Sequence, residues 1–268
     1  MKIDKGEGAA KRDLGRGFAG RRMDLDVGHF SYWVRPGTAP TLVLIPGSFN
    51  DAYALGDIID GLDENMQLAV VEVRGHGRGW PPPRGGSIEQ FAQDALRVID
   101  ELGLDCCYVG GHSIGGMIAL EVGRVQPQKV RGIISMEGWT SHHVLSDAFG
   151  GDVSSTLSPQ QQARNEALRR RVLGRWTDEQ IAEFRTYWKK WDGYDFLCRT
   201  ELPILELYGD RGRNRPSLAQ LRIPARANIQ VEWMAHVSHN LQLECPQAVA
   251  WACRDFIARI ERETVSGQ

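Results

Sequence analysis

An apolar run passes directly into a glycine-rich turn at Cys106-Cys107-Tyr108-Val109-Gly110-Gly111-His112-Ser113-Ile114-Gly115-Gly116-Met117, and a helix-compatible segment follows. This is a Gly-x-Ser-x-Gly sequence between an expected buried strand and an expected helix. The glycines two residues either side of Ser113 let strand and helix approach closely, so the serine would project from a sharp turn beside the helix N-terminus. Ser113 is therefore the candidate nucleophile. The alternative is a glycine-rich turn that contains a serine incidentally.

Length, charge and cysteine usage exclude several classes of protein. The 268 residues suffice for one α/β domain with an inserted subdomain, and a net charge of -2 gives no reason to expect nucleic acid or a membrane surface as partner. No apolar run approaches the ~18 residues that span a bilayer. The N-terminus lacks the apolar core of a secretory signal. Five cysteines without metal-ligand spacing favour reduced thiols and a cytoplasmic location.

Apolar runs of strand length alternate with segments of helical period. Strands are expected at 41–45, 68–73, 130–136, 203–208, 229–234 and in the run before Ser113, and helices at 52–62, 87–102, 247–261 and after Ser113. Continuous apolar runs are typical of parallel strands covered on both faces. The sequence therefore predicts an α/β fold, with a mostly parallel sheet between helices. Residues 23–25 and 30–34 are expected to form an edge hairpin.

The chain divides into three segments by composition. Residues 1–21 are charged and glycine-rich without apolar periodicity, so we expect a mobile leader there. Residues 22–139 and 201–264 carry the alternating strands and helices of the core. Residues 140–200 are rich in Arg, Gln and Trp, and capping-box patterns at Ser158 and Thr177 predict two helices. This third segment is expected to be an inserted helical cap.

Four motifs in order resemble those of the α/β-hydrolase fold superfamily, from residue 22 to about residue 262. Leu44-Ile45-Pro46-Gly47 resembles the loop that forms half of the oxyanion hole, although Pro46 replaces the usual His. Residues 74–79 resemble the turn after the next strand, and residues 111–115 resemble the nucleophile elbow. Residues 238–246 resemble the loop that carries the general base. The resemblance implies the α/β-hydrolase fold with an added cap.

The same resemblance implies acyl transfer to water. A base takes the Ser113 proton as its oxygen attacks a carbonyl, and a carboxylate orients the base. The backbone N–H groups of Ser48 and Ile114 would bind the oxyanion. Water then hydrolyses the acyl-enzyme, and no metal or organic cofactor is required. The expected function is a serine hydrolase for a small ester, lactone or related acyl substrate.

His239 is the expected base among the seven histidines. It follows the last predicted strand, with Glu244 five residues and Pro246 seven residues later, as in the family. The alternative is that His236 is the base and His239 only packs. His112 is expected to be a structural hydrogen-bonding residue, and His76 either lines the site or stabilises its turn.

Two carboxylates compete for the role of the acid. Most family members place the acid a few residues after the seventh strand, where this chain reads Gly209-Asp210-Arg211-Gly212, with Gly212 at the customary position. Glu137 follows the sixth strand, 24 residues after Ser113, as in one branch of the haloalkane dehalogenases. Glu137 is therefore the first choice and Asp210 the second. Dehalogenase activity is not expected, because those enzymes use a carboxylate nucleophile.

Aromatic residues in and near the cap favour an apolar or aromatic small-molecule substrate. Phe49, Trp139 and His142 are the expected pocket residues. Phe184, Trp188 and Trp191 share one helical face and are expected to dock the cap rather than touch substrate. A homo-oligomer is compatible with the sequence.

Other functions are compatible with the same fold. The resemblance extends to cofactor-independent dioxygenases of N-heteroaromatic compounds, in which the His-acid pair deprotonates the substrate, and to carbon-carbon bond hydrolases. A ligand receptor with little turnover is a further alternative. Product analysis with and without oxygen, and turnover measured beside ligand binding, would separate these functions.

Overall fold

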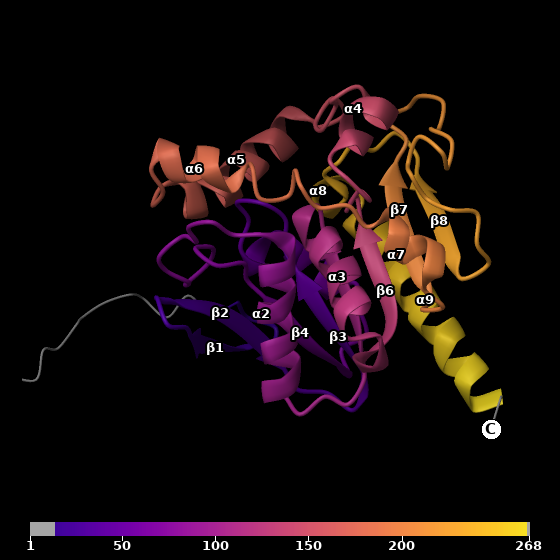
Figure 1. The fold of residues 1–268 in the computed structure, drawn as a ribbon, viewed down its shortest axis with the longest axis horizontal. Coiled ribbons are helices and arrows are strands. Elements are labelled where there is room, and N and C mark those ends of the chain that lie inside the picture. The colour runs from indigo at the N-terminus through magenta and orange to yellow at the C-terminus, as the bar shows by residue number, and fades with distance from the viewer. Residues whose placement is uncertain (1–13, 267–268) are drawn as a thin grey trace, which may run out of the picture.

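The computed structural model describes residues 14–266 and contains one eight-stranded sheet (Figure 1). Its strands are β1 (Ala19–Asp24), β2 (His29–Arg35), β3 (Ala39–Ile45), β4 (Met66–Val71), β5 (Cys107–His112), β6 (Val130–Met136), β7 (Ile204–Gly209) and β8 (Ile229–Met234). The order is β1-β2-β4-β3-β5-β6-β7-β8. β2 pairs antiparallel with both β1 and β4. The six strands from β4 to β8 in this order, β3 included, run parallel. The predicted parallel sheet with an edge hairpin is confirmed.

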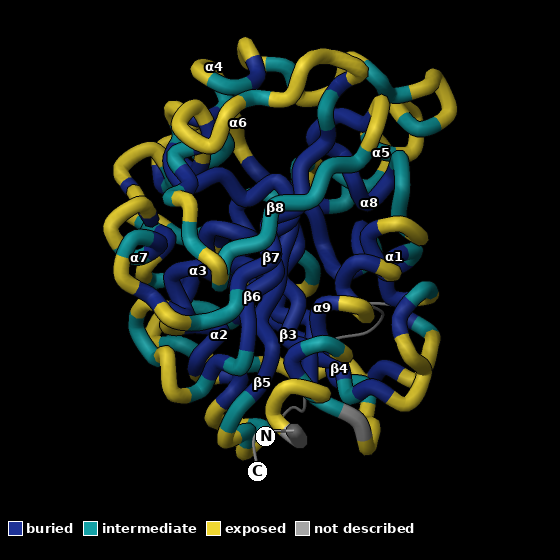
Figure 2. Tube along the Cα trace, turned by 90° about the vertical axis from the view of Figure 1, so that its right-hand side faces the viewer, coloured by how far each residue is buried: buried dark blue, intermediate teal, exposed yellow. Residues whose placement is uncertain are grey.

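Helices cover both faces of the sheet, which lies between them in Figure 2. One face carries α2 (Ile88–Glu101) and α3 (Ile114–Val125), and the other carries α1 (Gly56–Asp60) and α9 (Pro246–Ser266). The remaining short elements of the core are η1 (Ala52–Leu55), η2 (Pro127–Lys129), α7 (Tyr194–Arg199) and α8 (Leu241–Glu244).

Side-chain alternation along the strands explains why both faces are apolar. In β3, Val43 and Ile45 belong to the cluster that packs against α2 and α3, whereas Leu42 and Leu44 belong to the cluster that packs against α1 and α9. Successive residues of a strand point to opposite faces. A strand that is buried on both sides therefore has an unbroken apolar sequence, and this pattern predicted β3.

Ordered structure begins earlier than residue 22. β1 starts at Ala19, and both Leu14 and Phe18 are buried in the same cluster as Trp33. The expectation of a mobile leader is therefore wrong for residues 14–21, because two isolated apolar anchors produce no periodic pattern but still pack. Residues 1–13 of that leader lie outside the described residues.

The segment between β6 and β7 forms α4 (His143–Phe149), α5 (Pro159–Leu173) and α6 (Asp178–Phe184), which lie beyond the C-terminal ends of the parallel strands (Figure 1). The same segment ends in α7, whose Phe196 packs against Gly123 of α3, so the last part of the range expected for the cap belongs to the core. Capping boxes start α5 at Ser158 and α6 at Thr177, as predicted. Polar contacts attach this cap to the core. Arg171 pairs with Asp51 at 2.6 Å, and the Trp191 indole N–H donates to Glu121 at 3.0 Å.

Candidate active site

Ser113 lies in the turn between β5 and α3, with φ 57° and ψ -123°. The turn is too tight for side chains on its glycines. A Cβ on Gly111 would come within 2.4 Å of the Gly115 carbonyl carbon, and a Cβ on Gly115 within 2.1 Å of the Ile45 carbonyl oxygen. Both positions therefore require glycine, which is the physical reason for the Gly-x-Ser-x-Gly sequence.

Backbone hydrogen bonds hold Ser113 and Glu137 at the ends of adjacent strands. The Ser113 N–H donates to the Met136 carbonyl at 2.8 Å, and the Glu137 N–H donates to the Leu207 carbonyl at 2.8 Å. Each residue is the first after its strand, and parallel strands end at the same edge of a sheet. The fold thus brings the expected nucleophile and the first-choice acid to one edge.

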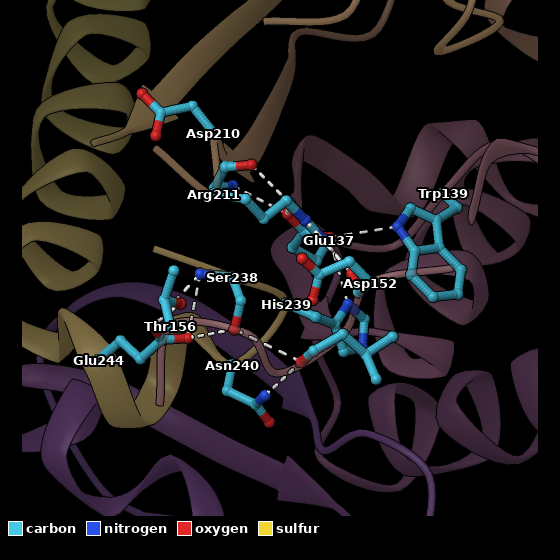
Figure 3. A network of polar contacts seen from close by, with 12 residues as sticks. Glu137, Trp139, Asp152, Thr156, Asp210, Arg211, Ser238, His239, Asn240 and Glu244 are labelled. Carbon is cyan, nitrogen blue, oxygen red and sulfur yellow. Dashed lines mark hydrogen bonds and ion pairs between the residues drawn. The ribbon is translucent and has the colours of Figure 1, made fainter. Parts of the chain in front are cut away.

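The Glu137 carboxylate is fully buried and has four hydrogen-bonding partners (Figure 3). Arg211 donates to both oxygens, at 2.7 Å and 2.9 Å, and the Gly209 N–H donates at 2.8 Å. The Trp139 indole donates at 3.2 Å. Burial opposes ionisation, but the hydrogen bonds from Arg211 and His239 outweigh it and lower the pKa of Glu137 to about 2. Glu137 is therefore an anion at neutral pH.

The fourth partner is His239, whose Nδ1 lies 3.2 Å from Glu137 Oε2. The His239 carbonyl lies 2.8 Å from Nε2 of the buried His112, and the two rings are 4.8 Å apart. His112 thus holds the loop that carries His239, which supports the structural role expected of His112. Burial lowers the pKa of His112 to about 3, so it is neutral at pH 7.

Contacts on the other side tie the His239 loop to the cap. Ser238 donates to Glu244 at 2.6 Å, and Thr156 of the cap also hydrogen-bonds to Glu244. The Asn240 side chain donates to the Val153 carbonyl at 2.6 Å (Figure 3). The loop and the start of the cap therefore form one hydrogen-bonded unit.

The second-choice acid and the alternative base lie together, away from this unit. Asp210 Oδ1 accepts from the backbone N–H groups of Gly212, at 2.8 Å, and His236, at 2.7 Å. In Figure 3 the Asp210 side chain points away from Glu137 and His239. Asp210 is thus a turn carboxylate after β7, and His236 is an exposed residue of the neighbouring turn after β8.

The expected oxyanion donors face no protein acceptor: within residues 14–266, neither the Ser48 N–H nor the Ile114 N–H has a hydrogen-bonding partner. The next amide along, from Phe49, donates to His76 Nε2 at 2.8 Å, and His76 Nδ1 lies 3.1 Å from the Arg74 carbonyl. Burial lowers the pKa of His76 to about 4. A neutral His76 therefore stabilises this loop, which answers the alternative that the sequence left open.

A cavity of about 320 Å³ lies between the core and the cap. It is lined by Ser48, Phe49, Ser113, Ile114, Met117, Trp139, Leu145, Val153, Arg169, Phe184, Arg185, Trp188 and Lys189. Two pocket expectations, Phe49 and Trp139, are among these residues. His142 is not; its ring packs on His143 at 3.7 Å, so that expectation needs correction. Trp191 docks the cap, whereas Phe184 and Trp188 also face the cavity.

Sequence reasoning missed the positive charge of this cavity. Arg169, Arg185 and Lys189 contribute to its lining, and no acidic residue does. Arg169 is the first of three consecutive arginines on α5. Because successive residues of a helix point in different directions, the sequence does not show which of the three arginines faces the cavity. The orientation of α5 in the cap decides this.

Strained backbone is concentrated around the site. Eight described non-glycine residues have positive φ, and five of them lie here: Phe49, Ser113, Glu137, Trp139 and Arg211. Such conformations persist only where the surrounding structure enforces them, and they gather at functional sites.

The part of the chain that the structure covers, residues 14–266, contains no group of three or more His, Cys, Asp or Glu residues that could hold a metal ion. None of the helices within that range is long and apolar enough to cross a membrane.

Residues 40–240 match the family model described as alpha/beta hydrolase fold. Among curated proteins, RutD of Serratia proteamaculans (strain 568), by its name a provisional carbamate hydrolase, is 33% identical over 102 residues, which is 38% of each chain. An acetyltransferase component of the acetoin cleaving system from Cupriavidus necator is 30% identical over 40% of this chain and 29% of its own. The matched part thus spans well under half of these relatives.

Solved structures of low sequence identity share the fold. An esterase from Thermogutta terrifontis has a TM-score of 0.71 at 20% identity, covering 90% of this chain and 99% of its own. A haloalkane dehalogenase variant from Bradyrhizobium elkanii has a TM-score of 0.69 at 18% identity, covering 92% and 99%. Est816, described as an N-acyl homoserine lactone degrading enzyme, has a TM-score of 0.69 at 22% identity, covering 88% and 100%.

Proposed function

The chain belongs to the α/β-hydrolase fold family, and on that premise we propose that it hydrolyses a small ester, lactone or related acyl substrate through an acyl-enzyme on Ser113. The observation that carries the proposal is the 3.2 Å contact between Glu137 Oε2 and His239 Nδ1. It lies at the edge of the sheet where Ser113 also lies, and Ser113 lines the cavity. A buried, ionised carboxylate beside an imidazole is the arrangement that orients a general base.

In the proposed reaction His239 accepts the Ser113 hydroxyl proton as the serine oxygen attacks the substrate carbonyl. Glu137 holds the imidazole in the Nδ1–H tautomer and stabilises its positive charge. The tetrahedral oxyanion accepts hydrogen bonds from the Ser48 and Ile114 N–H groups, and one such donor typically contributes about 3 kcal/mol. His239 then protonates the leaving alcohol, and the acyl-enzyme forms.

Deacylation follows the same route. His239 removes a proton from water as the water oxygen attacks the acyl carbonyl, and the proton returns to Ser113 as the acid product leaves. The names of the similar proteins, which include an esterase and a lactone-degrading enzyme, are compatible with this chemistry. A cytoplasmic location and the oligomeric state stay predictions.

The proposal is tested by treating the protein with a fluorophosphonate and with p-nitrophenyl acetate, and following the intact mass over time. We expect one adduct on the wild type and none on Ser113→Ala. Glu137→Gln is expected to lose roughly 10³- to 10⁴-fold in kcat, because the orienting carboxylate is gone. Asp210→Asn is the matched control, since this carboxylate only caps a turn, and should retain activity within about twofold.

Two outcomes would contradict the proposal. An unmodified Ser113, with no ester cleaved, would remove acyl transfer and favour the oxygenase or the receptor. Equal losses in Glu137→Gln and Asp210→Asn would instead show that Glu137 has no special role as the acid.

A further inference from the structure

Two arginines of the cap meet over one ring of the cavity. Arg169 is in the last turns of α5, and Arg185 follows directly after α6. Their guanidinium carbons lie 5.3 Å and 5.9 Å from the centroid of the Phe49 ring. Both residues line the cavity that Ser113 also lines. Two like charges therefore converge on the same space as the proposed nucleophile.

Neither of these two guanidiniums is paired with a carboxylate within residues 14–266. Other arginines of α5 are paired: Arg164 with Asp57 at 2.5 Å, and Arg171 with Asp51 at 2.6 Å. The polar contact of Arg169 is a long one of 3.5 Å to the Ser48 carbonyl. Arg164 and Arg171 of α5 thus dock the cap on aspartates of the core. Arg169, which lines the cavity, has no carboxylate partner among the described residues.

A bound anion would stabilise this arrangement. Burial first, and repulsion from Arg185 second, lower the pKa of Arg169, which means that the surroundings of its guanidinium disfavour the charged form. Lys189 adds a third positive charge to the lining. A guanidinium is the side chain best suited to bind a carboxylate or phosphate through paired hydrogen bonds.

We propose that the substrate is an anionic ester, whose carboxylate or phosphate group binds Arg169 and Arg185 while its scissile carbonyl lies at Ser113. This inference rests on the proposed function and adds the substrate's charge to it. Because Arg169 reaches the carbonyl of Ser48, whose N–H is a proposed oxyanion donor, the charged group lies only a few atoms from the reacting carbonyl. Phe49 and Trp188 contact the apolar carbons between the two.

The kinetic test compares two esters that differ in one negative charge and one methyl group: mono-p-nitrophenyl glutarate and its neutral methyl ester. Wild type should prefer the anionic ester. Arg169→Gln and Arg185→Gln are each expected to lower kcat/KM for the anionic ester by roughly 10- to 100-fold and kcat/KM for the neutral ester by much less, so that the ratio of the two falls. Added salt should weaken the preference.

Arg170→Gln is the matched control, because Arg170 lies on the same helix but is exposed and does not line the cavity. It should leave both esters unaffected. If Arg169→Gln fails to fold, Arg169→Lys keeps the charge but loses the paired geometry, and a reduced preference is then expected. A wild type that cleaves the neutral ester at least as well as the anionic one would overturn the inference, as would equal losses on both esters.

A binding measurement separates this inference from the hydrolase proposal. Calorimetry with monomethyl glutarate and with propyl phosphate, on Ser113→Ala, tests the anion site without turnover and shows which anion is preferred. Arg169-dependent binding with no Ser113 labelling would leave the anion site standing and the hydrolase proposal refuted. Ser113-dependent cleavage with no binding of either anion would do the reverse.

Discussion

Arg211→Met is expected to destabilise the fold by about 3 kcal/mol or more at pH 7, because it leaves a buried carboxylate without its main counter-charge. The side chains of Arg211 and Glu137 are 2% and 0% exposed, and their two hydrogen bonds are 2.7 Å and 2.9 Å long. Methionine keeps apolar contact with Phe149, whose ring lies 3.8 Å from the guanidinium carbon. The substitution therefore removes charge and hydrogen bonds more than it removes packing.

The magnitude follows from the pKa of Glu137, which falls from 4.5 to about 2 on folding. At about 1.4 kcal/mol for each pH unit, the ionised Glu137 contributes about 3 kcal/mol to stability. Because the folded pKa is the lower one, this contribution is present above pH 4.5 and is lost as the pH falls through 2. Without Arg211, burial dominates and the folded pKa rises, so the variant should lose stability as the pH rises from 5 to 7.

Urea denaturation at pH 5 and pH 7 measures both effects. Arg213→Met is the control, since Arg213 is 59% exposed in its contact with Asp152 and should cost less than about 1 kcal/mol. The double variant Arg211→Met/Glu137→Gln removes both charges of this buried pair and should recover most of the loss. If the double variant is as unstable as Arg211→Met, the loss arises from packing on Phe149 and the electrostatic reasoning is refuted.

Two other buried groups give predictions of the same kind. His76→Phe leaves the Phe49 N–H without its acceptor and should lower kcat on a neutral ester by roughly tenfold, with little change in KM. Steady-state kinetics that show only a change in KM would contradict this. Burial raises the pKa of Glu206 to about 8, so stability is lost as the pH rises from 4.5 through 8. Glu206→Gln should therefore stabilise by on the order of 3 kcal/mol at pH 7 and by little at pH 4, measured by urea denaturation; an equal gain at both pH values would argue against ionisation as the cause.

The core and the order of its site residues were predictable because they depend on short-range rules. Apolar runs identified the strands, and the glycines around Ser113 follow from contacts within one turn. The 24-residue separation of Ser113 and Glu137 is the path through one helix to the next parallel strand. Adjacent strands in such a sheet end at the same edge, so this separation brought the two residues together without knowledge of any side-chain contact.

The partners from distant segments were not predictable in the same way. Arg211 lies in the turn Gly209-Asp210-Arg211-Gly212, and nothing in the local sequence shows that its guanidinium reaches back to Glu137. Arg169 faces the cavity in the orientation of α5 that the ion pairs of Arg164 with Asp57 and of Arg171 with Asp51 hold, and those partners are distant in sequence. His142 was expected in the pocket because it lies at the start of the cap, but its ring packs on His143 where α4 begins.

The five residues with positive φ around the site require surplus stability from the rest of the fold, and this limits which substitutions the chain can accept during evolution. Each positive φ costs about 1–3 kcal/mol, so together they oppose folding by an amount comparable to the net stability of a typical domain, about 5–15 kcal/mol. Glycine would relax the backbone at Phe49, Ser113 or Glu137, but it would delete the side chain to which the proposed mechanism or pocket assigns a role. The surplus stability must come from the doubly covered sheet. Mutations that weaken this core therefore narrow the set of site sequences that the fold can tolerate, even when they lie far from the cavity.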